Sequence, residues 1–395
     1  MYNVKNEQLA NAIEQKGEFS GVTPLYKMCI RSLSDGSLYL GDIMYSVSSD
    51  VQSTSLPEDI ELGAVCSQQW TVELLDSGEN KFIGGEYEIS LYVRSRHSSL
   101  TYGDIKKHAC SELKDWRIEQ LAALGDAVCG EFIPMGICTC VKAPRTGSTR
   151  TLTLYDKLYF SDKQYNSKIR FPALASDVER DVCAQLGIEC SWDYEYEELI
   201  SDNGGNLLTE IGGSFLKTAS FDFTISHKPQ GYTMRQMLSY IASAKGQFGY
   251  VDRHGRYARK WYGIPSQALD NNTIDEPTLS EKANRVVGIV CIVNENTTLS
   301  IGEMQGGRVI EFENPYMNES LLKTLFNRVR RLTWHTAAVQ QRVGDPRMDI
   351  GDVVRYTDDK EQDYTIPITG LSFDFSGGLT ASITSVGLNE DEQLI

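Results

Sequence analysis

Long apolar runs are missing from this chain of 395 residues. None approaches the ~18 to 20 apolar residues that a helix needs to cross a membrane, so we expect no membrane insertion. The stretch from Met1 to Glu7 lacks the charged and then apolar pattern of a secretory signal, which predicts folding in the cytoplasm. A chain of this length can hold roughly two to four domains, each with its own core.

Paired cysteines and clustered histidines are missing as well. The nine cysteines are odd in number and scattered, and the five histidines are isolated from one another, which argues against a disulfide framework and a zinc site. Cys138 and Cys140 are close, and with one residue between them their side chains share one face of a strand. This favours core packing. We expect no metal and no cofactor.

Signatures of catalysis are also absent. The sequence contains no Gly-x-Ser-x-Gly, no His-Glu-x-x-His and no phosphate-cradling glycine loop. Glu195, Glu197 and Glu198 could in principle serve glycoside hydrolysis, but they alternate with tyrosines as on a strand with one solvated face. We predict that the chain is not an enzyme and keep a peptidoglycan hydrolase as the weakest alternative.

Positive charge is scarce. Lysine and arginine total 38 against 54 aspartates and glutamates, which gives a net charge of −16. Nucleic-acid binding as the main role is disfavoured, because phosphate neutralisation needs a clustered cationic surface. Two small basic clusters remain as candidate intersubunit contacts or solvated faces: Arg253, Arg256, Arg259 and Lys260 on a hairpin, and Arg328, Arg330 and Arg331 at the end of a helix.

Period-two alternation is abundant near both ends of the chain, and helical spacing with capping signals occupies the middle. The pattern predicts an α+β fold that is predominantly β, with two β-barrel-like domains flanking a mixed α/β domain. The expected segments are a lead at 1–22, a first barrel at 23–162 with an inserted helix at 104–124, the mixed domain at 163–275, and a second barrel at 276–395 with a helix at 318–332.

Capping boxes punctuate the middle region. Ser176-x-x-Glu179 predicts the start of a helix that Gly187 ends, and Thr233-x-x-Gln236 predicts the start of another. The polar, Pro/Asn-rich stretch 265–282 predicts a linker.

A charged turn precedes a strand near the C-terminal end, in the stretch 344–356. Pro346 fixes φ near −65°, aspartates offer side-chain caps, and Gly351 tolerates a backbone that a Cβ would forbid. The pattern predicts a tight turn that begins a strand at Val353.

Four stretches in this order resemble the tail-tip or baseplate hub family of tailed phages, prophages and contractile injection systems. They are 61–64, 132–136 leading into 151–156, 232–261, and 345–356. The resemblance covers nearly the whole chain and rests on order and spacing rather than on a strict motif.

The resemblance implies a homotrimer in the virion tail or in a phage-like particle. Two barrels per chain would make a six-fold-like ring that joins the tail tube to the tip. Implied partners are distal tail or tail tube proteins, the tape-measure protein and a downstream spike or receptor-binding protein. DNA would be in contact only in transit. Longer relatives resemble tail-associated lysins, so hydrolase activity is expected on another polypeptide. Acidic residues facing the bore would repel phosphate.

A carbohydrate-binding adhesin or receptor-binding tail protein is the main alternative, because 20 Tyr and 5 Trp could stack on sugar rings. Their dispersal counts against this role. Tyr39, Trp70, Tyr87, Tyr92 and Tyr155 fall in strand patterns, where packing across strand pairs explains them.

Overall fold

The computed structural model describes residues 2–4, 13, 24–40, 44–52, 60–75, 82–95, 130–193, 222–376 and 378–387. The expected helix at 104–124, most of the lead at 1–22 and the carboxylates at 195–198 lie outside these residues. None of the helices among the described residues has the length and apolar character to cross a membrane.

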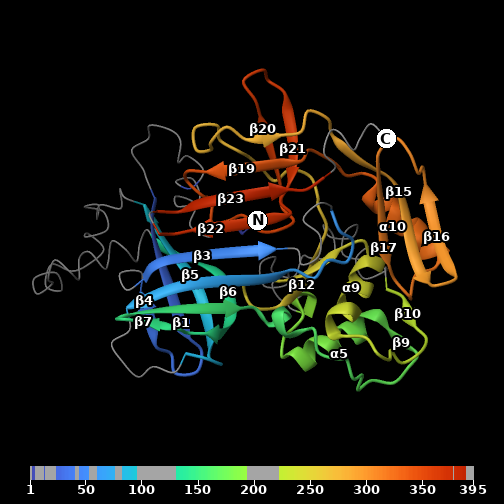
Figure 1. Cartoon of the computed structure of the whole chain (residues 1–395), viewed down its shortest axis with the longest axis horizontal. Helices are drawn as coiled ribbons and strands as arrows, with labels where there is room; N and C mark the ends of the chain where they lie inside the picture. The colour runs from blue at the N-terminus through green and yellow to red at the C-terminus, as the bar shows by residue number, and fades with distance from the viewer. Residues whose placement is uncertain are drawn as a thin grey trace, which may run out of the picture.

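The largest sheet has twelve strands and crosses the upper and left parts of Figure 1. Its order is β14-β19-β23-β22-β3-β4-β8-β6-β5-β1-β2, with β7 paired to β8. The bounds are β1 (Pro24–Ser32), β2 (Leu38–Leu40), β3 (Met44–Gln52), β4 (Ser67–Leu75), β5 (Glu86–Ser95), β6 (Gly130–Lys142), β7 (Arg145–Thr146), β8 (Thr149–Tyr155), β14 (Thr278–Leu279), β19 (Ala337–Gln341), β22 (Gly370–Asp374) and β23 (Thr380–Ser385).

The two β regions of the sequence meet at one pair of strands within this sheet. β22 pairs antiparallel with β3 from Gly370 opposite Gln52 to Asp374 opposite Ser48. The α+β, predominantly β composition is confirmed, whereas two separate barrels are not seen among the described strands. Alternation predicts that Leu371 and Phe373 face a core, but it does not say which strand lies beside them.

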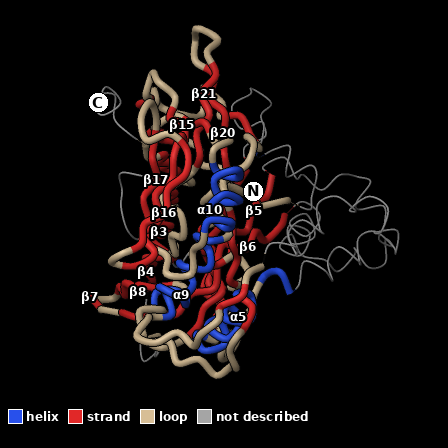
Figure 2. Tube along the Cα trace, turned by 90° about the vertical axis from the view of Figure 1, so that its right-hand side faces the viewer, coloured by secondary structure: helices blue, strands red, loops and turns tan. Residues whose placement is uncertain are grey.

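Smaller sheets and helices fill the rest of the structure (Figure 2). A four-stranded sheet holds β15 (Asn284–Asn294), β16 (Thr297–Gly302), β17 (Arg308–Glu313) and β18 (Thr333–Trp334). The others hold β13 (Gln267–Ala268) with β20 (Val353–Thr357) and β21 (Asp363–Pro367), β9 (Ala173–Leu174) with β10 (Thr224–Ile225), and β11 (Phe248–Val251) with β12 (Tyr257–Lys260). The helices are α5 (Ala175–Leu186), α9 (Met234–Ala244) and α10 (Glu319–Val329), with short 3-10 turns η2 (Lys157–Phe160) and η3 (Ser191–Asp193).

Two large apolar cores lie under these elements. The first joins strands from both ends of the chain and includes Trp70, Leu91 and Ile383. The second gathers the helices and the four-stranded sheet and includes Leu238 and Trp334. The segment 284–334 therefore packs with the helical region rather than with the twelve-stranded sheet.

Helix starts test the capping predictions. The box at Thr233 and Gln236 is confirmed, since each side chain bonds the backbone of the other residue. The box at Ser176 and Glu179 is wrong, because the N-cap of α5 is Leu174, two residues earlier. Ser176 donates to Asp222 instead, from its backbone N at 3.3 Å and from its Oγ at 2.5 Å. A remote carboxylate thus takes the capping role that the local sequence assigns to serine.

The predicted linker at 265–282 is also wrong. It supplies β13, which pairs in parallel with β20, and β14, which pairs with β19. Leu269 and Ile274 are buried in the first core. Composition suggested a free segment, but two apolar side chains at the right places hold the backbone against neighbouring strands.

Candidate functional site: a cavity at the junction of the sheets

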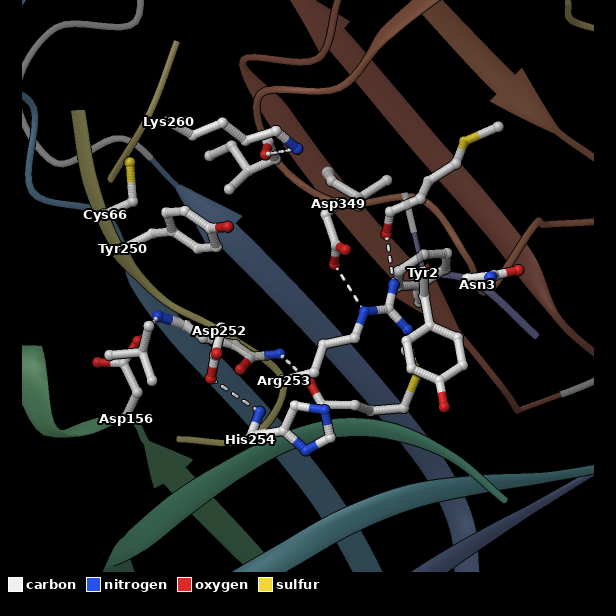
Figure 3. A pocket seen from close by; sticks show the side chains of 17 residues that line it. Tyr2, Asn3, Cys66, Asp156, Tyr250, Asp252, Arg253, His254, Lys260 and Asp349 are labelled. Carbon is white, nitrogen blue, oxygen red and sulfur yellow. Dashed lines mark hydrogen bonds and ion pairs between the residues drawn. The ribbon is translucent and has the colours of Figure 1, made fainter. Parts of the chain in front are cut away.

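A cavity of about 460 Å³ lies where seven segments of the chain meet (Figure 3). Its walls come from the N-terminal residues, β4, β6, the β11–β12 hairpin and the turn that leads into β20. β22 adds two apolar side chains, Leu371 and Phe373. The cavity therefore lies close to the pairing of β3 with β22.

The turn before β20 carries a buried ion pair. Asp345 is 0% exposed, and its two oxygens accept from Arg347 Nε at 3.0 Å and Nη2 at 2.8 Å. Gln267 donates to the same carboxylate at 2.8 Å. This two-pronged geometry is the strong form of a charge-assisted bond. The turn was predicted, but its burial was not.

Arg253, from the turn of the β11–β12 hairpin, binds three other segments. Its Nε donates to Asp349 Oδ1 at 2.8 Å, its Nη2 to the Met348 carbonyl at 2.8 Å, and its Nη1 to the Pro134 carbonyl at 3.2 Å. The guanidinium also lies beside the Tyr2 ring (Figure 3), 5.3 Å from its centre. One side chain thus links the hairpin to β6, to the turn before β20 and to the N-terminal residues.

Lys260 and Gly351 complete the contact of the hairpin with the turn. Lys260 Nζ lies 2.5 Å from Asp352 Oδ1, and although burial opposes it, this cation lowers the pKa of Asp352. Gly351 has φ +78°, and a Cβ there would lie 2.4 Å from Phe248. We call Arg253, Lys260, Asp345, Arg347, Asp349 and Asp352 the junction charges.

Asp156 forms another wall of the cavity and is 1% exposed. It accepts from Ser67 Oγ at 2.9 Å, Gln68 N at 2.6 Å and Leu158 N at 2.9 Å. Burial raises the pKa of Asp156 to about 6, even though these hydrogen bonds act in the opposite direction. This carboxyl ties the end of β8 to the start of β4.

A second group of charges lies between α5, α9 and β12. Glu179 is 0% exposed and lies 3.4 Å from Lys245 Nζ and 3.0 Å from Arg259 Nε. Lys245 also lies 3.3 Å from Asp222, and Arg259 lies over the Trp192 ring at 4.5 Å. We call Glu179, Asp222, Lys245 and Arg259 the helix charges.

The structure separates the seven predicted interface cations. Arg253 and Lys260 belong to the junction charges and Arg259 to the helix charges. Arg256 pairs with Asp252 in its own turn at 2.9 Å, and Arg328 donates to the Lys245 carbonyl at 2.8 Å. Arg330 and Arg331 are exposed at the end of α10. A role for the seven between subunits stays a prediction.

The charged groups around the cavity already bind one another, so the site is suited to holding segments together. Within the described ranges, no three His, Cys, Asp or Glu side chains gather as they would to hold a metal ion. Sequence reasoning missed Asp156, Glu179 and the Asp345–Arg347 pair. For the Asp345–Arg347 pair, the available signal was the four charged residues within 345–352, which alternate with apolar ones.

Most of the aromatic residues weighed for sugar binding are packed against other rings. Trp70 is 0% exposed, Tyr39 lies 5.7 Å from Phe82, and Tyr155 stacks on Tyr159 at 3.9 Å. Tyr92 lies 4.8 Å from Phe132, whose side chain is exposed.

Comparison with known proteins gives no match to a family model and none to a curated protein. Among solved structures, the 43 kDa tail protein of prophage MuSo2 from Shewanella oneidensis aligns with 91% of this chain and 97% of its own, at 13% identity and a TM-score of 0.47. The E. coli c3393 protein is a type VI secretion component described as similar to the T4 tail proteins gp27 and gp5. Its alignment covers 91% of this chain and 77% of its own, at 8% identity and a TM-score of 0.42. A chain of a phage P2 baseplate structure aligns with 93% of this chain and 100% of its own, at 7% identity and a TM-score of 0.29.

These neighbours are tail and baseplate proteins or are described as similar to them, the class that the sequence resembles. Each TM-score is below 0.5, a level at which two chains need not share a fold.

Proposed function

We propose that this chain is a structural, non-enzymatic component of a phage or phage-like tail tip, where three copies form a hub ring between the tail tube and the distal tip. The observation that carries the proposal is the pairing of β3 with β22. It joins the β regions from both ends of the chain into one sheet, which suits a rigid wall segment of a ring.

The junction charges support the same role. Arg253 and the turn 345–352 fix the hairpin, the N-terminal residues and the large sheet in one arrangement. A part that transmits load needs a fixed geometry between its sheets. Apolar contacts could form in several relative placements of these segments, whereas the buried ion pairs form in one.

The acidic balance gives the ring a second property. With a net charge of −16 per chain, carboxylates on the inner face would repel DNA and let it or a tape-measure protein pass without sticking. The electrostatic potential of an assembled ring tests this part, and a neutral or basic bore would contradict it.

The decisive experiment is light scattering and electron microscopy of the full chain, alone and co-expressed with its tail tube neighbour. We expect the mass of three chains and a three-fold ring with a central hole. A monomer in both preparations, with no ring, would contradict the proposal. Saturable binding of the monomer to a glycan array would instead support the alternative, a carbohydrate-binding adhesin or receptor-binding tail protein.

A further inference from the structure

The outer strand of the four-stranded sheet has an open edge. β16 pairs along its length with β15, and among the described residues no strand pairs with its other side. Figure 1 places it at the rim of the molecule, beside β15. Leu299 and Ile301 are half-buried against the second core, while Thr298 and Ser300 are exposed.

The register shows which backbone groups face outward. Glu303 N donates to the Val287 carbonyl at 2.9 Å, so this pair is hydrogen-bonded. In an antiparallel ladder, bonded and non-bonded pairs alternate. Ser300 lies opposite Val290, three positions from Glu303 along the strand, so it falls in a non-bonded pair. Its N–H and C=O therefore point toward the open edge.

Other long edge strands carry the features that discourage pairing with another chain. Natural edges are protected by charges and prolines. Among described strands of five or more residues with an open edge, β16 alone has neither: its sequence is Thr-Thr-Leu-Ser-Ile-Gly. The other two carry such residues, namely Arg308, Glu311 and Glu313 in β17, and Asp363 and Pro367 in β21.

The charges that flank β16 indicate the kind of strand that fits. Glu295 and Glu303 lie exposed just before and just after the strand. If two copies of β16 paired antiparallel about their centres, Glu295 of one would come near Glu303 of the other at both ends. Chains that each carry a net charge of −16 would add to this repulsion. A second copy is therefore a poor occupant.

We propose that β16 is a docking edge for an extended segment of a different protein, with an uncharged alternating centre and basic residues at both ends. The segment would add a strand to the sheet, with main-chain bonds to Thr298 and Ser300 and ion pairs to Glu295 and Glu303. This inference stands apart from the proposed tail role, because it uses only the edge and its flanking charges.

Labelled peptides of roughly ten residues test it by fluorescence anisotropy with the full chain. Both peptides alternate Thr and Val at the centre, and one ends in lysines while the other ends in glutamates. We expect the lysine-ended peptide to bind at least about tenfold more tightly, with a preference that weakens as salt is added.

Two variants separate docking at β16 from nonspecific attraction. Ser300→Pro removes an outward N–H, which an edge strand tolerates, and it should weaken binding at least about tenfold, whereas Ser300→Thr should bind as the wild type does. The charge reversal Glu295→Lys with Glu303→Lys should make the glutamate-ended peptide the tighter ligand, and it keeps the test valid if Ser300→Pro fails to fold.

Three results would overturn the proposal. The first is equal binding of the two peptides or no binding of either. The second is lysine-ended binding that Ser300→Pro leaves unchanged in a folded chain. The third is self-association that Ser300→Pro abolishes, because that result would assign the edge to a second copy.

Discussion

The junction charges and the helix charges are both buried, but they are balanced in different ways. At the junction each cation has its own carboxylate at 2.5 to 2.8 Å, and Arg253 also binds two backbone carbonyls. Among the helix charges, Glu179 is shared between two cations at 3.0 and 3.4 Å. Removing one junction carboxylate should therefore leave one cation without a partner, whereas removing Glu179 leaves Arg259 without a carboxylate and Lys245 with Asp222 alone.

The largest effect is expected from Glu179→Gln. The change leaves Lys245 and Arg259 buried without their shared carboxylate, which should lower the free energy of unfolding by about 4 kcal/mol. Urea denaturation measures it. Glu319→Gln, at an exposed position in the first turn of α10, is the control and should cost less than about 1 kcal/mol. Equal costs for the two changes would contradict the sharing of Glu179.

Arg253→Met should rank next, at about 3 kcal/mol. It strands Asp349, whose side chain is 29% exposed and keeps some water, and it frees two carbonyl groups. Arg256→Met, three positions along the same hairpin, removes a pair with Asp252 in its own turn and should cost less than Arg253→Met, at about 1 kcal/mol. If the two variants unfold at the same urea concentration, Arg253 does not hold the junction.

Asp156 sharpens the comparison, because hydrogen-bond donors rather than a cation hold it. Its pKa is 3.8 when unfolded and about 6 in the fold, so the folded state binds the extra proton between these values. Stability from this group is full below pH 3.8 and is lost as the pH rises through 6, by about 2 to 3 kcal/mol.

The measurement is the difference in unfolding free energy between the wild type and Asp156→Asn from pH 4 to 7. Subtraction cancels the titration of the other acids. A difference that stays constant over this range would mean that the pKa of Asp156 is not raised.

The smallest effect concerns shape at the junction rather than charge. Gly351→Ala adds a Cβ 2.4 Å from Phe248 at φ +78° and should cost about 2 kcal/mol. Gly147→Ala has φ +64° but nothing within 4 Å, so it should cost about 1 kcal/mol, the strain alone. Thermal unfolding of both variants isolates the clash, and equal shifts would exclude it.

Local structure could be predicted well from the sequence. The helix at 318–332 is confirmed as α10, with Asn318 accepting from Leu321 N, and Gly187 ends α5 in the left-handed conformation. These features depend on residues within one turn of each other. Alternation likewise located β4, β5, β6 and β8.

Neighbours across the chain could not be predicted. Nothing near Leu371 indicates that β3 will lie beside it, and nothing near Ser176 indicates that Asp222 will cap its helix. The four predicted hairpin cations do lie on one hairpin. The burial of three of them depends on carboxylates in 345–352 and on Glu179. Charge pairing over such separations leaves no periodic signal.

The pairing of β3 with β22 has a consequence for synthesis. β3 leaves the ribosome long before β22 exists, and until Gly370 to Asp374 arrive, one side of Met44–Gln52 lacks its final neighbour. The growing polypeptide must carry an unfinished sheet through most of translation, so its yield in a cell should depend on chaperones that shield that strand.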